Sequence, residues 1–349
     1  MRWKNRPAGA NWGEFGPDDE RGRMNLVTRE KVLQGVAEVR EGITFCLSLP
    51  LDYPGGAALN PRRSPPRLAA TLRDAGPNRG RQNFCYPLAA DNPDHSDVVC
   101  DDVALLALQY STQWDSFAHV GSLFDADGDG RREVVFYNGF RGGEHVLPSP
   151  GRKAEGWARY EGTKARALGI QNLAEHGAQG RGVLVDLHAH FGRSRTPVGY
   201  EDLMRVMQAD KVVVERGDML CLYTGFADVV LELKKNPDPK LLHGTCSGLD
   251  GRDERLLQWI SDSGLACLIA DNYAVELIPA SLSKPAPSAL MPLHEHCLFK
   301  NGIHLGELWY LTELARWLRE HRRNRFLLTA PPLRLPGAVG SPATPIATV

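Results

Sequence analysis

Residues 109–121 read QYSTQWDSFAHVG and place Gln109, Gln113, Asp115 and His119 within eleven positions. The apolar run VALLAL that precedes them has the length of a strand, so we expect a buried strand that ends where these polar residues begin. Asp115 and His119 are four residues apart and could face one pocket. The stretch therefore predicts a functional site close to the end of a strand.

Strands and helices alternate along the rest of the chain without an internal repeat. Apolar periodicity predicts helices at 28–42, 199–210, 253–264 and 305–324, and strands at 43–51, 181–190, 217–226 and 265–272. The early strands argue against a purely parallel sheet and favour a mixed α/β domain. We expect one domain over 1–349, with a surface excursion at 53–81 and a packed C-terminal tail at 331–349.

The composition limits the kind of partner. Lysine and arginine number 41 against 42 acidic residues, so no net field favours nucleic acid or an anionic membrane. The seven cysteines include no CxxC pair and predict neither a disulfide framework nor a zinc knot, so we expect them to be reduced and buried. With no apolar leader and no membrane-length segment, the chain is interpreted as a cytoplasmic protein that binds a small molecule.

One acidic stretch resembles a calcium loop. Asp125, Asp127 and Asp129 have the required offsets, but Phe136 occupies the twelfth position, where a bidentate glutamate is needed. An Asp/Gly-rich hairpin turn is the favoured interpretation, because the alternating segment REVVFYN follows.

Histidines gather at two other places. His188 and His190 share one side of the strand predicted at 181–190, a spacing that can chelate metal but is more typical of a structural pair. The segment HEHCLFKNGIHLGE is richer, because it holds His294, His296, His304 and Glu307 within fourteen residues. A metal-ligand role and a structural role are equally compatible with this segment.

Seven stretches, taken in order, carry a family resemblance. They are STQWDSFAH, YNG, RGVLVDL, GDMLCLYTG, DNYAVE, PLHEHCLFKNGIHLGE and GSPATPIA. Together they resemble the metal-dependent cyclase family, which includes bacterial kynurenine formamidase and isatin hydrolase. The resemblance spans nearly the whole chain. It implies a single mixed-sheet α/β domain of the swivelling β/β/α type, with peripheral helices.

The family signature His-x-Gly-Thr-His-x-Asp-x-Pro-x-His is only partly kept. Gln109 and Gln113 stand where its first two histidines would be, whereas Asp115 and His119 match the pattern. A large bacterial branch of the family carries Gln-Trp-Asp in place of His-x-Asp, so Gln113 is interpreted as a branch feature. By resemblance, His119 acts in proton transfer.

The resemblance also implies a divalent metal ion held by Asp115, His294 and Glu307. Gln109 and Gln113 are assigned to either metal or substrate. An amide oxygen is a neutral, hard ligand that binds zinc less well than imidazole does, while carboxylate and carbonyl oxygens suit manganese, magnesium or calcium. We therefore expect manganese to be favoured over zinc.

The implied reaction is metal-assisted hydrolysis of a small cyclic or acylated amide, lactam or lactone, with His119 as the proton relay. Trp114, Phe117 and Tyr137 supply aromatic surface near the motif and are predicted to bind a planar substrate, although ordinary core positions would explain them equally well.

Two other functions stay open. Loss of two histidines could leave a metal-free, ligand-binding protein on the same scaffold. A cyclase or dehydratase acting on a polyketide-like substrate would use the same polarised carbonyl. Members of the family form dimers or tetramers, so the resemblance implies a homodimer or homotetramer.

Overall fold

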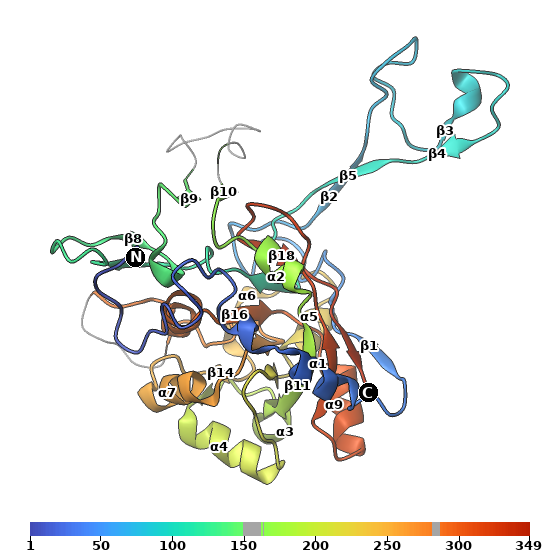
Figure 1. The fold of residues 1–349 in the computed structure, drawn as a ribbon. Coiled ribbons are helices and arrows are strands. Elements are labelled where there is room, and N and C mark those ends of the chain that lie inside the picture. Colours follow the sequence, from blue (N-terminus) through green and yellow to red (C-terminus); the bar gives the residue numbers. More distant parts are fainter. Residues whose placement is uncertain (149–161, 163, 281–286) are drawn as a thin grey trace.

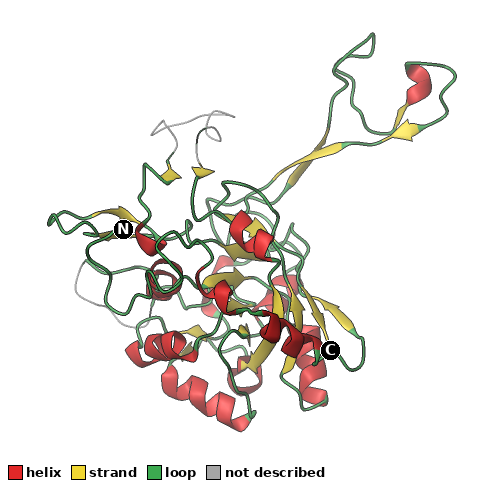
Figure 2. Ribbon diagram, viewed as in Figure 1, coloured by secondary structure: helices red, strands yellow, loops and turns green. Residues whose placement is uncertain are grey.

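The computed structural model describes residues 1–148, 162, 164–280 and 287–349. Its centre is a nine-stranded mixed sheet, in which β11, β13, β15 and β16 are parallel and the other pairings are antiparallel. The predicted mixed α/β fold is confirmed (Figures 1 and 2). The strands follow one another across the sheet as β1 (Thr44–Cys46), β19 (Ile346–Thr348), β17 (Arg325–Thr329), β11 (Gln179–Asp186), β13 (Met219–Tyr223), β15 (Cys267–Ala270), β16 (His304–Glu307), β6 (Gln113–Asp115) and β18 (Gly340–Pro342).

Helices cover both faces of this sheet (Figure 2). Alternation along β11 shows the division, because Val183 and Val185 join the cluster that contains α4 and α7, whereas Leu184 joins the cluster that contains α2 and α9. The helices are α1 (Arg29–Val36), α2 (Gln171–His176), α3 (Leu187–Phe191), α4 (Tyr200–Ala209), α5 (Phe226–Glu232), α6 (Pro239–Gly244), α7 (Glu254–Ser263), α8 (Pro292–His294), the π-helix η5 (Glu295–Lys300), α9 (Thr312–Glu320) and the 3-10 helices η1 (Gly22–Leu26), η2 (Leu88–Ala90) and η3 (Tyr137–Gly139). No helix in these ranges is both long enough and apolar enough to cross a membrane.

Short two-stranded ribbons decorate the body. The ribbon of β7 and β8 encloses the Asp/Gly-rich loop, so the predicted hairpin is confirmed. The ribbons pair β2 (Arg67–Ala70) with β5 (Asp102–Leu105), β3 (Tyr86–Pro87) with β4 (Val98–Val99), β7 (Ser122–Phe124) with β8 (Glu133–Val135), β9 (Val146–Leu147) with β10 (Lys164–Ala165), and β12 (Pro197–Val198) with β14 (Gly248–Leu249).

A long arm leaves the body after β1 (Figure 1). The β2–β5 ribbon forms its stalk, and the β3–β4 ribbon lies at its far end. Leu68, Leu72 and Val103 are exposed on it. The apolar run at 103–108 is therefore not the buried strand that we predicted, because its first three residues lie in β5 of this projecting ribbon and the rest form no strand. Hydrophobicity alone does not reveal whether a second layer covers a strand.

Two predicted elements change at the sheet. The helix predicted at 305–324 is wrong in its first part, because His304–Glu307 forms β16 between β15 and β6, and only α9 is helical. The strand predicted at 181–190 stops at Asp186, and α3 carries the two histidines that follow. In the first case, pairing with two neighbouring strands outweighs the helical periodicity.

The first helix is shorter than predicted, and its buried residues are not large apolar ones. Thr28 caps α1 by accepting a hydrogen bond from the backbone N–H of Lys31. The buried residues of α1 are Lys31, which pairs with the buried Asp218 at 3.0 Å, and Gly35. A Cβ at Gly35 would come within 2.8 Å of the β11 backbone. Close approach and an ion pair, rather than an apolar stripe, hold this helix.

The cysteine prediction is partly wrong. Four cysteines are buried, but Cys46, Cys85 and Cys100 are exposed. Cys85 and Cys100 face each other in the arm with their sulfur atoms 3.8 Å apart, and both are free thiols.

In the tail at 331–349, β18 and β19 both join the central sheet.

Candidate active site

The register of β6 against β16 builds the site. Gln113 lies opposite Glu307, and Asp115 lies on the same face of β6 as Gln113 because side chains alternate along a strand. Trp114 points to the opposite face, where its indole ring contacts Trp309 edge-on with ring centroids 5.1 Å apart. One strand thus supplies the site with two polar side chains and the core with an aromatic one.

Asp115, His294 and Glu307 converge on one buried point. One ligand atom from each lies within 4.8 Å of the others. The His294 Nε2 atom is 3.1 Å from Glu307 Oε1, and His294 itself stands at the end of α8, directly before the π-helix η5. The residues that the family resemblance assigns to the metal are therefore brought together, Asp115 from one part of the chain and His294 and Glu307 from another.

Gln113 organises this cluster instead of standing apart from it. Its amide Nε2 donates to Glu307 Oε2 at 3.1 Å and approaches Asp115 Oδ1 at 3.4 Å. The remaining Asp115 Oδ2 and Gln113 Oε1 atoms are buried and have no hydrogen-bond partner among the described residues. Buried oxygens of this kind are costly unless a proton donor or cation meets them. One imidazole and two carboxylates, one of which has an unpartnered oxygen, fit a divalent cation.

Glu276 fixes the orientation of His294, and we did not predict this role from the sequence. The buried carboxylate accepts hydrogen bonds from His294 Nδ1 at 2.8 Å and from the backbone N–H groups of Leu293 and His294. With Nδ1 engaged, Nε2 is directed toward Glu307. A carboxylate behind a ligand histidine is the usual arrangement around protein metal ions.

Strained backbone accompanies both glutamates. Val275 and Leu308 adopt φ values of 58° and 55°, a region that side-chain-bearing residues rarely occupy. Asn272 is hydrogen-bonded to both of these residues. Its Oδ1 accepts from Val275 N at 2.7 Å, and its backbone carbonyl accepts from Leu308 N at 2.8 Å. The loop after β15 thereby sets the positions of Glu276 and Glu307 together.

The electrostatics of the cluster reflect burial and crowding. Burial, reinforced by the charge of Asp115, raises the pKa of Glu307 to about 7, against the opposing effects of His294 and Arg63. Burial lowers the pKa of His294, but hydrogen bonds to Glu276 and Glu307 outweigh it and raise the value to about 10. The metal-free cluster therefore retains protons, which a bound cation would replace.

His119 lies beside the cluster at the wall of a pocket of about 690 Å³, which His294 and Glu307 also line. Its Nε2 atom is 3.8 Å from Asp115 Oδ1, and its side chain is 20% exposed. Burial lowers the pKa of His119 below its ordinary 6.5, against the charge of Asp115. The imidazole is consequently neutral at pH 7 and can accept a proton. Gln109 also lines this pocket.

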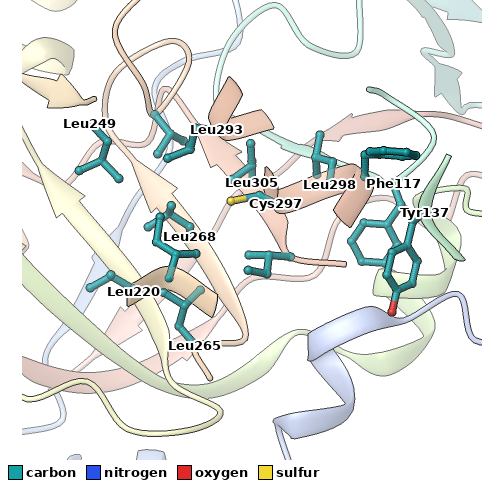
Figure 3. Packing of buried hydrophobic residues seen from close by; sticks show 14 of the residues in the cluster. Phe117, Tyr137, Leu220, Leu249, Leu265, Leu268, Leu293, Cys297, Leu298 and Leu305 are labelled. Atoms are coloured by element: carbon teal, nitrogen blue, oxygen red, sulfur yellow. The ribbon is translucent and has the colours of Figure 1, made fainter. Parts of the chain in front are cut away.

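The aromatic residues predicted to bind substrate lie elsewhere. Trp114 belongs to the core on the far face, and its indole N–H donates to the carbonyl of Ala330. Figure 3 shows Phe117 and Tyr137 side by side within the other core cluster. The pocket wall instead contains Tyr110 and Tyr273, which nothing in the local sequence distinguishes from core tyrosines.

The remaining candidates have structural partners. His188 Nδ1 lies 3.2 Å from the carbonyls of Gly192 and Thr224, and His190 pairs with Asp210 at 3.0 Å.

Two histidines close to the site in sequence also have structural partners. His296 contacts Ser261, and His304 Nδ1 bonds the backbone carbonyl of Asp115, which supports β6. Asp125, Asp127 and Asp129 form a surface cluster with one oxygen from each within 4.8 Å of the others.

Comparison with known proteins identifies the family and relatives of the fold. The family model described as "Putative cyclase" matches residues 81–277. A crystal structure of a novel cyclase shares 30% sequence identity, with a TM-score of 0.71 over 97% of this chain and 99% of the other. Isatin hydrolase A from Ralstonia solanacearum has 13% identity and a TM-score of 0.53, covering 92% and 97% of the two chains.

Isatin hydrolase A from Labrenzia aggregata, bound to benzyl benzoate, has 12% identity and a TM-score of 0.52, over 91% of this chain and 97% of the other. No curated protein matches significantly. The fold and the buried polar cluster define an α/β protein with a candidate metal centre. By family model and by its 30% identical structural relative, the chain belongs to the cyclase family.

Proposed function

We propose that this protein is a metal-dependent hydrolase of a small amide, lactam or lactone. The convergence of Asp115, His294 and Glu307 beside a pocket that His119 also lines carries the proposal. The shared fold with isatin hydrolases, whose name denotes a cyclic amide as substrate, supports the same chemistry.

Each residue has a defined part in this proposal. Asp115, His294 and Glu307 would hold a divalent cation, and Gln113 keeps the two carboxylates in place by hydrogen bonding. Such a cation supplies Lewis acidity toward a carbonyl oxygen and acidifies water. His119, neutral at pH 7, accepts the proton of the attacking water and delivers it to the leaving nitrogen or oxygen.

The donor set favours manganese over zinc. One imidazole with two carboxylates is a harder set of ligands than the histidine-rich sites that zinc prefers. Gln113 stands where the family signature has a histidine, so a second imidazole is missing. Protein stripped with a chelator and reloaded should regain more activity with manganese than with zinc. Equal recovery with zinc would contradict the preference without affecting the hydrolase proposal.

A metal analysis coupled to a screen of lactones and N-acyl aromatic amines tests the function. We expect a product that has gained one water and a reaction that stops on chelation. Full activity without metal would overturn the proposal. A product that has lost water would indicate a dehydratase, and binding without turnover would indicate a ligand-binding protein.

We also propose a homodimer or homotetramer that acts on a small molecule, without nucleic-acid or membrane partners. The exposed Leu68, Leu72 and Val103 of the arm support assembly, because isolated two-stranded ribbons are only marginally stable in water. Sedimentation of the full chain at two concentrations tests it. The mass of a single chain at both would contradict assembly.

A further inference from the structure

Arg62 and Arg63 line the same pocket as His119, His294 and Glu307. Arg62 is exposed at the rim, and Arg63 is half-buried. Neither guanidinium has an ion-pair partner in the described parts of the chain. Two neighbouring cations that face a pocket without a paired carboxylate are electrostatically unfavourable. Like charges repel, and a pocket wall offers less solvation than open surface.

The loop that carries the pair is held in a defined shape. Asn60 accepts from the backbone N–H of Arg62 through its side chain at 3.1 Å and from that of Arg63 through its carbonyl at 3.0 Å. Tyr110 donates to the carbonyl of Gly56 at 2.9 Å, which anchors the start of the loop. Both arginines are thus presented toward the pocket by an ordered turn.

Arg63 is further oriented by its own side chain. One of its terminal nitrogens donates to the carbonyl of Gln109 at 2.6 Å, and the other N–H groups of the guanidinium have no hydrogen-bond partner among the described residues. Because both arginines share one pocket wall with His119, His294 and Glu307, the guanidinium charges face the space in front of the cluster.

The charge balance favours an anion. If a divalent cation neutralises the charges of Asp115 and Glu307, the two positive charges of the arginines exceed the one negative charge of Glu276 behind His294. The rest of the wall is largely apolar, including Leu59, Ile278, Leu290 and Met291. A ligand that fits this surface has an apolar body and one negative group, and a planar guanidinium matches a carboxylate in both charge and shape.

We infer that Arg62 and Arg63 form a subsite for a carboxylate on the substrate, so that the enzyme acts on anionic amides, lactams or lactones. This inference rests on the proposed function, because the bound ligand is a substrate only if the protein is a hydrolase. The subsite makes a separate prediction about binding. A carboxylate held there would place the apolar body along the pocket and the reacting bond beside His119.

Calorimetry on the metal-loaded protein with benzoate and benzamide tests the subsite. The two probes differ in charge but hardly in size. We expect benzoate to bind at least about tenfold more tightly, and the double variant Arg62→Gln/Arg63→Gln to remove this preference while leaving benzamide affinity and metal content unchanged. Arg63→Lys is the matched control, since it keeps the charge but loses the planar fork.

Two outcomes overturn the inference. Equal affinity for benzoate and benzamide would show that no anion subsite exists. A benzoate preference that survives the double variant but disappears in metal-free protein would place the carboxylate on the metal instead. Neither measurement requires turnover, so a protein that prefers benzoate through its arginines but hydrolyses nothing would refute the proposed function and leave the subsite intact.

Discussion

Among the residues that the structure describes, two groups of three have their ligand atoms within 4.8 Å of one another, and they differ in what surrounds the oxygens. At the surface, Asp125 accepts backbone N–H groups of Gly128, Asp129 and Gly130. In the buried cluster, Asp115 Oδ2 has no described partner. The Asp125 carboxylate is already satisfied by its own loop, whereas the buried Asp115 Oδ2 needs an external cation or a proton.

The largest expected difference between the two clusters is in metal retention. Asp115→Asn removes a charged ligand and keeps the shape of the side chain, so we expect metal content to collapse. Turnover should fall by about a thousandfold or more, because the cation supplies several kcal/mol of transition-state stabilisation. Elemental analysis after gel filtration and steady-state kinetics provide the measurements.

Asp127→Asn is the matched control, since the same atom change is made in the surface cluster. It should leave metal stoichiometry and turnover at wild-type values. If Asp127→Asn lowers metal content and Asp115→Asn does not, the assignment of the two clusters is reversed.

His119 offers a finer separation, because it lies beside the buried cluster without belonging to its three converging ligands. We expect His119→Ala to keep its metal and its melting temperature yet to lose about a hundredfold to ten-thousandfold in kcat. The wild-type acid limb of kcat/KM should lie below pH 6.5, since burial lowers the pKa of His119, and the variant should lack it. Metal loss in step with activity would instead make His119 a ligand.

Sequence patterns predicted the fold class and the three converging residues for different reasons. The mixed sheet follows from strand and helix periodicity, while Asp115, His294 and Glu307 depended on a family motif, because they meet only through the pairing of β6 with β16 and the position of α8. Glu276 could not be identified. Its importance lies in three hydrogen bonds made across the fold, and no local pattern marks it.

The errors also have physical causes. Trp114 alternates away from Gln113 and Asp115, so proximity in sequence placed it on the wrong face for substrate binding. The apolar run before Gln109 is strand-like, but its first residues pair with β2 in an isolated two-stranded ribbon and not with the central sheet. Long-range pairing decides both outcomes, and a single sequence does not contain it in readable form.

The pH dependence of stability provides a smaller but directional contrast. In the metal-free protein, the pKa of Glu307 is raised to about 7 and that of His294 to about 10. Both groups hold protons more tightly when folded, so their contribution is greatest at low pH and is lost as pH rises through these values. A bound cation replaces the protons. The melting-temperature gain on metal loading should therefore increase from pH 5.5 to 8.5, and a gain independent of pH would contradict this account.

The smallest effect belongs to the surface cluster. Asp125→Ala removes an acceptor that serves three backbone N–H groups, but the loop is open to water, which can replace them. We expect a loss of about 1 kcal/mol in the free energy of unfolding, measured by urea titration, with metal content and turnover unchanged. Calcium should not raise the melting temperature of wild-type protein more than that of the variant, because the position of a bidentate glutamate is occupied by Phe136. Calcium-dependent stabilisation that Asp125→Ala abolishes would show that the surface cluster binds an ion. It would also show that carboxylates with hydrogen bonds from their own loop can still form a cation site.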